Sequence, residues 1–320
     1  MINSKDILKG DRRALAKAIT LVESSKAEHR EEAHKLLEEI LPHTGNSYRI
    51  GITGTPGVGK STFIETFGEY LISLGKKVAV LAVDPTSPMT GGSILGDKTR
   101  MEKLSNNESA YIRPSPSSGH LGGVAFHTRE TILLCEAAGF DTILVETVGV
   151  GQSEIQVSQM VDFFMVLLLP NAGDELQGIK KGILELADGI IINKADGKTK
   201  DLANLAKSQY ESAITLFHNR GFWIPKVLTC SATKNEGILE IHSLLNEYQE
   251  CSIKEKNWEE KRVDQLKKWF KGSLEFELSS RIQKNSVYKE KFAEYEKEIL
   301  NLKKTPGSAA DSIASLIFKA

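Results

Sequence analysis

Seven short apolar runs alternate with helical patterns along this 320-residue chain, and this alternation constrains the fold more than any other feature. The runs are rich in β-branched and aromatic residues, which favour strands, and the segments between them have the spacing of amphipathic helices. Such alternation predicts an α/β fold, with a doubly wound and mostly parallel sheet between layers of helices. The predicted strands are Tyr48–Thr53, Val78–Val83, Ala110–Arg113, Thr142–Glu146, Phe163–Leu169, Gly189–Ile192 and Val227–Cys230.

Helical patterns without strands flank the α/β region on both sides. Asp11 can cap one helix, and a second helical pattern stops before Pro42. After about residue 250 the strand signals end and the chain becomes rich in Lys and Glu. We therefore expect an N-terminal helical extension over 1–46, an α/β domain over 47–250 and a C-terminal helical arm over 251–320.

The predicted arm carries a regular apolar seam. Its residues follow one another at spacings of four, three, four and three: Tyr288, Phe292, Tyr295, Ile299 and Leu302. A seam of this kind on a charged helix needs a facing surface. Packing on the protein's own core and packing on a second copy of the chain both satisfy this need, and the spacing does not separate them. A last short helix is expected over Ser308–Phe318.

The turn after the first predicted strand fits the phosphate-binding loop pattern, in which four residues separate two glycines before Lys-Ser. Backbone N–H groups and the start of a helix would bind the phosphates of a nucleotide, and Lys60 would reach the outer ones. The Ser61 hydroxyl would coordinate Mg²⁺, and Thr62 would lie near the inner phosphate. The predicted nucleotide-binding residues of this turn are Gly54, Thr55, Pro56, Gly57, Val58, Gly59, Lys60, Ser61 and Thr62.

Composition excludes several other classes of partner. The 41 Lys and Arg residues balance 42 Asp and Glu residues, so no basic field favours nucleic acid or an anionic membrane. The three cysteines are widely spaced, which is typical of a reducing compartment. No signal-peptide pattern is visible, and the longest apolar run is too short to cross a bilayer. We expect a cytoplasmic, soluble protein.

The sequence Asn193-Lys194-Ala195-Asp196 follows the sixth predicted strand and selects the base. The Asp196 carboxylate can accept hydrogen bonds from N1–H and the exocyclic amino group of guanine, whereas adenine presents an acceptor at N1. Asn193 would join this turn to the phosphate loop, and the Lys194 stem would cover the base plane. Ser231, Ala232 and Thr233, after the last strand, fit a further contact to guanine. GTP and GDP are the expected ligands, although the phosphate loop alone also fits ATP.

Four stretches carry a resemblance to a known family: 83–88 (VDPTSP), 95–101 (LGDKTRM), 146–154 (ETVGVGQSE) and 173–182 (GDELQGIKKG). With the phosphate loop and the guanine turn, the chain resembles the MeaB/ArgK-type P-loop GTPases. These proteins are chaperones of adenosylcobalamin-dependent methylmalonyl-CoA mutase and include the methylmalonic aciduria type A protein.

Two carboxylates end strands at the edge where such sheets bind ligands, and both are candidate Mg²⁺ ligands with Ser61: Asp84 and Glu146. The resemblance adds Asp97 to the metal and switch region, although Asp97 alone also fits an exposed turn. It also implies that Lys180 and Lys181 belong to a switch facing the client, whereas a solvated helix face is the alternative.

Slow hydrolysis is expected of this chain. Small signalling GTPases place a water-orienting glutamine directly after the glycine of the strand-end motif, and this chain has Val150 there. Gln152 lies two residues further on and would need rearrangement by a partner. We therefore expect catalysis to depend on Lys60, Glu146 and Gln152.

The resemblance implies a homodimeric GTPase that gates cofactor loading and protects an adenosylcobalamin-dependent acyl-CoA mutase, with methylmalonyl-CoA mutase first among the clients. Isobutyryl-CoA mutase and ethylmalonyl-CoA mutase are the alternative clients. The alternatives are a protein kinase or ATPase linked to amino-acid transport and a metal-delivery GTPase.

Overall fold

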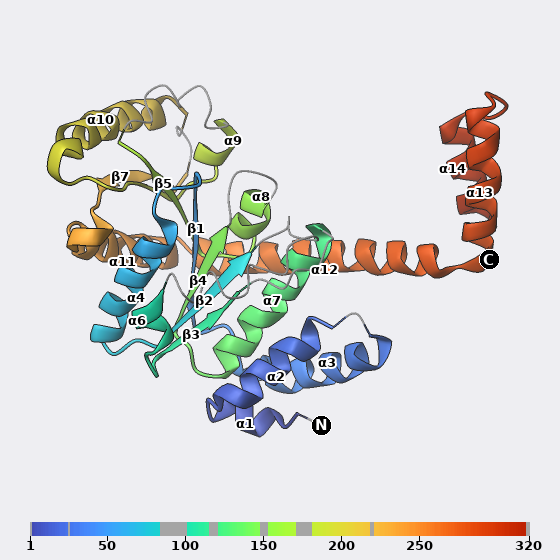
Figure 1. The fold of residues 1–320 in the computed structure, drawn as a ribbon, viewed down its shortest axis with the longest axis horizontal. Coiled ribbons are helices and arrows are strands. Elements are labelled where there is room, and N and C mark those ends of the chain that lie inside the picture. The colour runs from blue at the N-terminus through green and yellow to red at the C-terminus, as the bar shows by residue number, and fades with distance from the viewer. Residues whose placement is uncertain are drawn as a thin grey trace. The chain divides into compact units, whose positions relative to one another are not determined.

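The computed structural model describes residues 2–24, 26–83, 101–114, 121–147, 153–170, 181–217 and 221–317. Within these ranges, seven strands form one sheet in which every strand pair is parallel. The strands are β1 (Tyr48–Gly54), β2 (Val78–Val83), β3 (Ala110–Arg113), β4 (Thr142–Thr147), β5 (Phe163–Leu168), β6 (Gly189–Ile192) and β7 (Lys226–Thr229). The predicted α/β fold is confirmed, and each predicted strand lies within one or two residues of an observed one (Figure 1).

The strand order is β3-β2-β4-β1-β5-β6-β7, which places the first strand in the middle of the sheet. The chain moves from β1 to one side through β2 and β3, returns to β4, and then crosses β1 to reach β5. In α/β sheets with such a reversal, ligands bind at the carboxyl ends of the central strands. The turn after β1 lies at this edge of the sheet.

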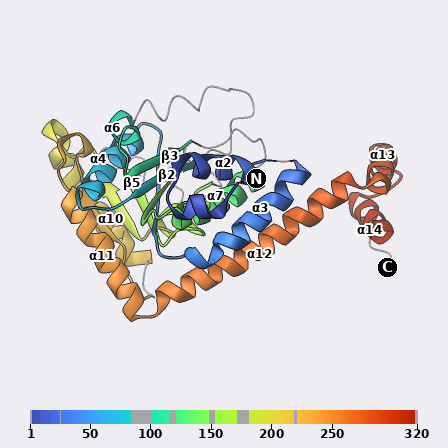
Figure 2. The same cartoon turned by 90° about the horizontal axis from the view of Figure 1, so that it is seen from below.

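Helices cover both faces of the sheet, so its central strands are buried on both sides. Both β4 and β5 are buried at every position. Residues of three helices share one core with β1, β2 and β5 (Figure 2). These helices are α4 (Lys60–Ser73), α6 (Glu102–Ser105) and α11 (Ile238–Lys254).

The other face carries α7 (Leu121–Ala137) and α8 (Ser153–Ser158). At Gly51 in β1 a Cβ atom would lie 2.8 Å from the Phe164 ring and 3.0 Å from the side chains of Val157 and Val161. Glycine at this position therefore allows the segment of α8 to pack directly on β1. Further along the sheet, α9 (Lys181–Leu184) precedes β6, and α10 (Lys200–Phe217) packs on β6 and β7.

The N-terminal helices pack together and against α7 (Figures 1 and 2). They are α1 (Ser4–Leu8), α2 (Arg12–Val22) and α3 (Ala27–Ile40), and a 3-10 turn, η1 (Leu41–His43), follows them. Asp11 caps α2 as predicted, because its carboxylate accepts from the backbone N–H groups of Arg13 and Ala14 at 2.8 Å each.

A buried clamp fixes the linker between these helices and β1. The Glu136 carboxylate, on α7, accepts from the Gly45 N–H at 2.8 Å and from the Ser47 hydroxyl at 2.5 Å. The Arg262 guanidinium donates to the backbone carbonyls of Gly45 and Ser47. Arg49 completes the cluster with two hydrogen bonds to Glu136, at 2.8 and 3.0 Å.

The contacts divide the chain into two units, Met1–Val263 and Asp264–Ala320, and the division falls within α12 (Asn257–Lys284). In the first unit, Arg262 also donates two hydrogen bonds to the buried Asp162 carboxylate, both at 2.8 Å. In the second unit, α13 (Ser286–Leu300) and α14 (Pro306–Ile317) pack against each other and bury Ala309 and Ile313.

The predicted seam of α13 is wrong at its last residue, because the helix ends at Leu300. Leu302 has a φ of 56° and is 95% exposed. The N–H groups of Leu302 and Lys303 bond back to the carbonyls of Ile299 and Glu298, which is the Schellman pattern of helix termination.

Candidate functional site

The predicted phosphate loop lies between β1 and α4, at the carboxyl edge of the central strand. Gly54, Gly57 and Gly59 have φ values of 154°, 80° and 96°, a region that favours glycine. A Cβ atom at Gly54 would lie 2.5 Å from the Leu167 carbonyl, and one at Gly59 would lie 2.9 Å from Asn193 Nδ2. The loop therefore requires glycine both for its conformation and for the close approach of its neighbours.

Lys60 begins α4 and its ammonium is buried beneath the loop. Its Nζ donates to the carbonyls of Gly54 at 2.7 Å and Thr55 at 3.4 Å. Burial lowers the pKa of Lys60 below its ordinary value, and the carboxylates of Glu146 and Glu154 partly offset this effect. A buried ammonium at the start of a helix suits a polyanionic ligand. The next two residues differ in exposure, since Ser61 is half-buried and Thr62 is exposed.

One predicted pair of metal ligands lies together. Glu146, near the carboxyl end of β4, is 7% exposed, and its Oε1 lies 3.4 Å from the Ser61 hydroxyl. A hydroxyl and a carboxylate oxygen side by side are the hard donors that Mg²⁺ prefers, so these two residues fit the ion. Asp84, Asp97, Gln152 and Lys180 lie outside the described residues. Lys181 begins α9, and only its backbone is described.

The predicted guanine turn is hydrogen-bonded to the phosphate loop. Asn193 Nδ2 donates to the Val58 carbonyl at 2.9 Å, and Lys194 Nζ donates to the Gly57 carbonyl at 2.7 Å. Asn193 is buried, whereas Lys194 is exposed and has a φ of 59°. The two turns therefore form one connected surface at the carboxyl edge of the sheet.

The segment after β7 completes this surface. Asp196 accepts a hydrogen bond from the Ser231 hydroxyl through Oδ2, which fixes the orientation of the carboxylate. The Ala232 N–H donates to Asn193 Oδ1 at 3.3 Å, and the Ser231 and Thr233 hydroxyls are 3.3 Å apart. The structure thus brings Asn193, Asp196 and the 231–233 segment together beside the phosphate loop.

Sequence reasoning missed two supporting contacts and one buried carboxylate. The Thr66 hydroxyl, on α4, donates to the Ala232 carbonyl at 3.0 Å and so connects the helix to the 231–233 segment. The buried hydroxyls of Thr147 and Thr53 are 2.7 Å apart and join β4 to β1. Glu154 on α8 is fully buried. Of these residues, Thr147 and Glu154 could have been singled out from the sequence, since both lie in the 146–154 motif.

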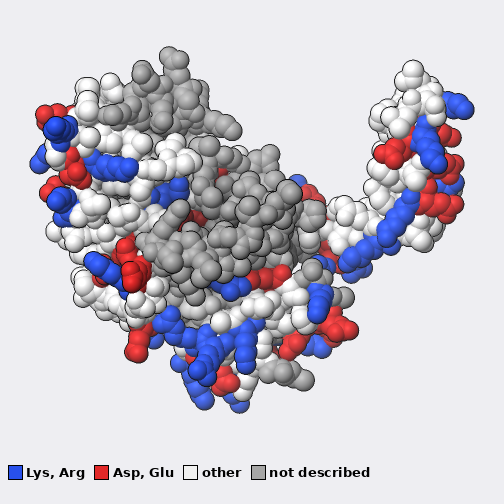
Figure 3. Space-filling view, in the orientation of Figure 1, with Lys and Arg blue, Asp and Glu red and all other residues white. Residues whose placement is uncertain are grey.

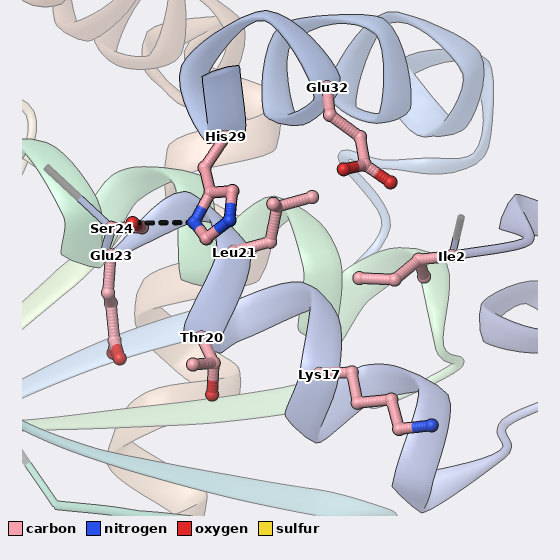
Figure 4. A pocket seen from close by; sticks show the side chains of 8 residues that line it. All are labelled: Ile2, Lys17, Thr20, Leu21, Glu23, Ser24, His29 and Glu32. Carbon is pink, nitrogen blue, oxygen red and sulfur yellow. Dashed lines mark hydrogen bonds between the residues drawn. The ribbon is translucent and has the colours of Figure 1, made fainter. Parts of the chain in front are cut away.

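A separate pocket of about 610 Å³ lies on the N-terminal helices (Figure 4). His29 Nδ1 and the Ser24 hydroxyl are 2.7 Å apart at its wall. Figure 3 shows Lys and Arg side chains gathered over these helices, but the pocket itself is lined by both signs of charge. It therefore lacks the anion-binding character of the phosphate loop. Its lining residues are Ile2, Lys17, Thr20, Leu21, Glu23, Ser24, His29 and Glu32.

Two kinds of feature are absent from the described residues. They contain no cluster of three or more His, Cys, Asp or Glu side chains arranged to hold a metal ion. Within the same part of the chain, no helix has both the length and the apolar character needed to span a membrane.

Comparison with known proteins agrees with this geometry. Residues 15–287 match the family described as methylmalonyl Co-A mutase-associated GTPase MeaB. The chain is 49% identical to GTPase ArgK of Escherichia coli, over 87% of this chain and 85% of that protein. It is 45% identical to the mouse protein named methylmalonic aciduria type A homolog, mitochondrial, over 95% of this chain and 76% of the other.

A solved structure has the same fold over almost the whole chain. It is described as LAO/AO transport system kinase, and it matches with a TM-score of 0.78 and 38% identity over 98% of this chain and 96% of its own. The phosphate loop, the guanine turn and these matches lead to one conclusion. The chain is a P-loop GTPase and belongs to the MeaB family of methylmalonyl-CoA mutase-associated GTPases.

Proposed function

We propose that this GTPase is a chaperone that uses its nucleotide state to gate cofactor loading of an adenosylcobalamin-dependent acyl-CoA mutase and to protect that enzyme. Methylmalonyl-CoA mutase is the first candidate client, because the family description and the name of the mouse relative both point to it. The structural observation behind the proposal is the hydrogen-bonded surface that joins the phosphate loop to the guanine turn.

Each part of this surface has a proposed role in nucleotide binding. Backbone N–H groups of residues 54–59 and the start of α4 bind the phosphates, and Lys60 donates to the outer ones. Asp196 accepts from N1–H and the amino group of guanine, while Asn193 and Lys194 hold the base against the phosphate loop. Ser231, Ala232 and Thr233 form the other side of the base pocket.

Ser61 and Glu146, with Asp84 and Asp97, are the residues that we assign to Mg²⁺. When bound, the ion would neutralise charge that develops on the phosphate oxygens. The 3.4 Å separation between the Ser61 hydroxyl and Glu146 supports this assignment for two of the four.

Hydrolysis by the isolated chain is proposed to be slow. Val150 stands where small signalling GTPases have a water-orienting glutamine, and Gln152 would take that role after the client rearranges its segment. Lys180 and Lys181 are proposed to face the client. The cycle would run in the cytoplasm, where the buried free thiols of Cys135 and Cys230 stay reduced.

We also propose that the working unit is a homodimer formed through the C-terminal arm. Four apolar side chains recur at every fourth position of α12 and are exposed in the single chain: Leu266 (58%), Phe270 (72%), Leu274 (49%) and Leu278 (41%). An apolar row of this kind is stabilised when a second helix covers it.

Purified components test the chaperone function. GTP hydrolysis is measured with and without the methylmalonyl-, isobutyryl- and ethylmalonyl-CoA mutases, and inactivation of each mutase during turnover is followed in parallel. We expect one mutase to accelerate hydrolysis about tenfold or more and to survive longer when GTP is present. The Lys60→Ala variant, which lacks the phosphate-binding ammonium, should give neither effect. If no mutase alters the hydrolysis rate, the client assignment is wrong.

The description of the solved relative as a transport system kinase raises a second function. A kinase would move the labelled γ-phosphate of the nucleotide to a protein, whereas a GTPase releases it as inorganic phosphate. Label recovered in a protein band in place of free phosphate would favour the kinase.

A further inference from the structure

A hydroxyl on α4 bonds across to the proposed base pocket, and the nucleotide chemistry described above does not use it. The Thr66 hydroxyl donates to the Ala232 carbonyl at 3.0 Å. Thr66 is half-buried and Ala232 is buried, so this hydrogen bond is partly shielded from water. A hydrogen bond in such surroundings restricts the groups that it joins more than an exposed one does.

The Thr66 hydroxyl differs from other helical threonine hydroxyls in its partner. Thr20 on α2, Thr131 on α7 and Thr215 on α10 each donate to the carbonyl four residues earlier in their own helix, at 2.8 to 2.9 Å. Such a local bond is a usual one for a helical hydroxyl. Thr66 bonds instead to a residue 166 positions away. Its contact therefore belongs to the tertiary structure and not to α4 alone.

The two ends of this hydrogen bond carry different parts of the proposed nucleotide site. Lys60 begins α4, and Thr66 lies about 9 Å further along the same helix. At the other end, Ala232 begins a 3-10 turn, η4 (Ala232–Lys234), that packs on α4. The bond thus relates the 231–233 segment to the helix that starts at the phosphate loop.

Ala232 is held at both of its backbone polar groups. Its N–H donates to Asn193 Oδ1 at 3.3 Å, and its carbonyl accepts from Thr66 at 3.0 Å. The bond to Asn193 is at the long end of the usual range, so the Thr66 bond is the shorter of the two. Loss of the Thr66 hydroxyl would leave the 231–233 segment attached to the guanine turn but less tightly to α4.

We propose that Thr66 is a positioning residue for guanine binding, because its hydroxyl holds the 231–233 segment at a fixed distance from the helix that begins at Lys60. The inference rests on the proposed base pocket and deepens it. A nucleotide spans the phosphate loop and the base pocket, so it gains affinity when the two are already held at the separation that it requires. Inorganic pyrophosphate does not span them, and its binding should not depend on Thr66.

The test compares the binding of GDP and of inorganic pyrophosphate to the Thr66→Val variant, which keeps the shape of the side chain and removes its hydroxyl. We expect GDP to bind about tenfold more weakly and to leave faster. Pyrophosphate, measured by calorimetry, should bind as it does to the wild type. Thr66→Ser keeps the hydroxyl and should restore GDP affinity. Thr20→Val removes a hydroxyl that bonds within its own helix and should leave both ligands unaffected.

Pyrophosphate separates positioning from a general loss of structure. If Thr66→Val weakens the binding of both ligands equally, Thr66 is a structural residue and its proposed role is wrong. Thr66→Ala gives the same comparison if valine prevents folding.

The Asp196→Asn variant tests the base pocket itself. If this variant binds GDP as tightly as the wild type, the proposed pocket fails. If Asp196→Asn weakens GDP binding but the folded Thr66→Val variant does not, only the role of Thr66 is overturned.

Discussion

Asp196 depends on its neighbour for its orientation. The Ser231 hydroxyl donates to Oδ2 of the carboxylate and so restricts its rotation. An oriented carboxylate can present one acceptor from each of its two oxygens to the edge of a base, which a rotating one does less often. At the scale of single residues, the proposed selection of guanine would therefore depend on a pair of side chains that are 35 positions apart in the sequence.

The Asp196→Asn variant tests this pair. An amide cannot accept from N1–H and the amino group together, so GTP affinity should fall by about 100-fold or more. Xanthosine triphosphate, which has a carbonyl in place of the amino group, should bind the variant better than the wild type. Competition of both nucleotides against a fluorescent GDP analogue measures this switch. Unchanged affinity for GTP would show that Asp196 does not contact the base.

Glu136 makes the folding stability of the protein depend on pH. Burial raises the pKa of this carboxyl, but its hydrogen bonds to Arg49, Ser47 and the Gly45 N–H outweigh burial, so the net pKa lies below the ordinary value of 4.5. A carboxyl with a lowered folded-state pKa stabilises the fold fully above its unfolded-state pKa. This contribution is lost as the pH falls through the folded-state value.

We therefore expect the Glu136→Gln variant to be less stable than the wild type at neutral pH. The difference should narrow as the pH falls below about 4.5. Denaturant unfolding at a series of pH values measures it. Glu31→Gln, at an exposed carboxylate paired with Lys35, should give a much smaller difference. A difference in unfolding free energy between the wild type and Glu136→Gln that does not vary with pH would contradict this account.

The positions of some of these residues could be predicted from the sequence and those of others could not, for a physical reason. The phosphate loop and Asn193–Asp196 could be predicted because each is a local pattern next to its own strand. The clamp on the linker could not be predicted, because Glu136 and Arg49 are 87 positions apart and Arg262 and Asp162 are 100 positions apart. Such pairs depend on how α7 and α12 pack, and a single sequence shows no periodicity for that. Glu154 could be seen in its motif, but its burial could not.

At the scale of elements, the start of α11 is defined by a close approach of two backbones. Gly237 caps this helix with a φ of 80°, and a Cβ atom there would lie 2.4 Å from the Thr229 carbonyl at the end of β7. The turn between β7 and α11 also carries the 231–233 segment of the proposed base pocket. The geometry of the pocket thus depends on glycine at a position outside it.

The Gly237→Ala variant should lose about 2 kcal/mol or more of unfolding free energy, because it adds both backbone strain and a clash. Gly75→Ala is the matched control, since Gly75 has a φ of 82° and no atom within 4 Å of a Cβ. That variant has the strain alone and should lose about 1 kcal/mol. Chemical denaturation of both proteins separates the two effects. Equal losses would show that the Thr229 contact relaxes without cost.

At the scale of the whole molecule, the apolar row of α12 should decide the oligomeric state. Phe270→Glu places a charge at the most exposed of its four residues and should convert the proposed dimer to a monomer. Light scattering at micromolar concentration gives the mass, with Lys271→Glu as the control at a neighbouring exposed position. A wild-type mass equal to one chain would contradict the proposed homodimer.

The clamp on the linker at residues 45–47 also bears on how the protein assembles during synthesis. Arg262 and Gly45 are 217 positions apart, so the ribosome releases the N-terminal helices long before the arginine that secures their connection. Domains form from the N-terminus as the chain emerges, and contacts of such long range close last. Glu136 can bind the linker while translation continues, whereas the bonds from Arg262 must wait for α12. A nascent chain interrupted before α12 would therefore keep its sheet while its N-terminal helices remained loosely attached.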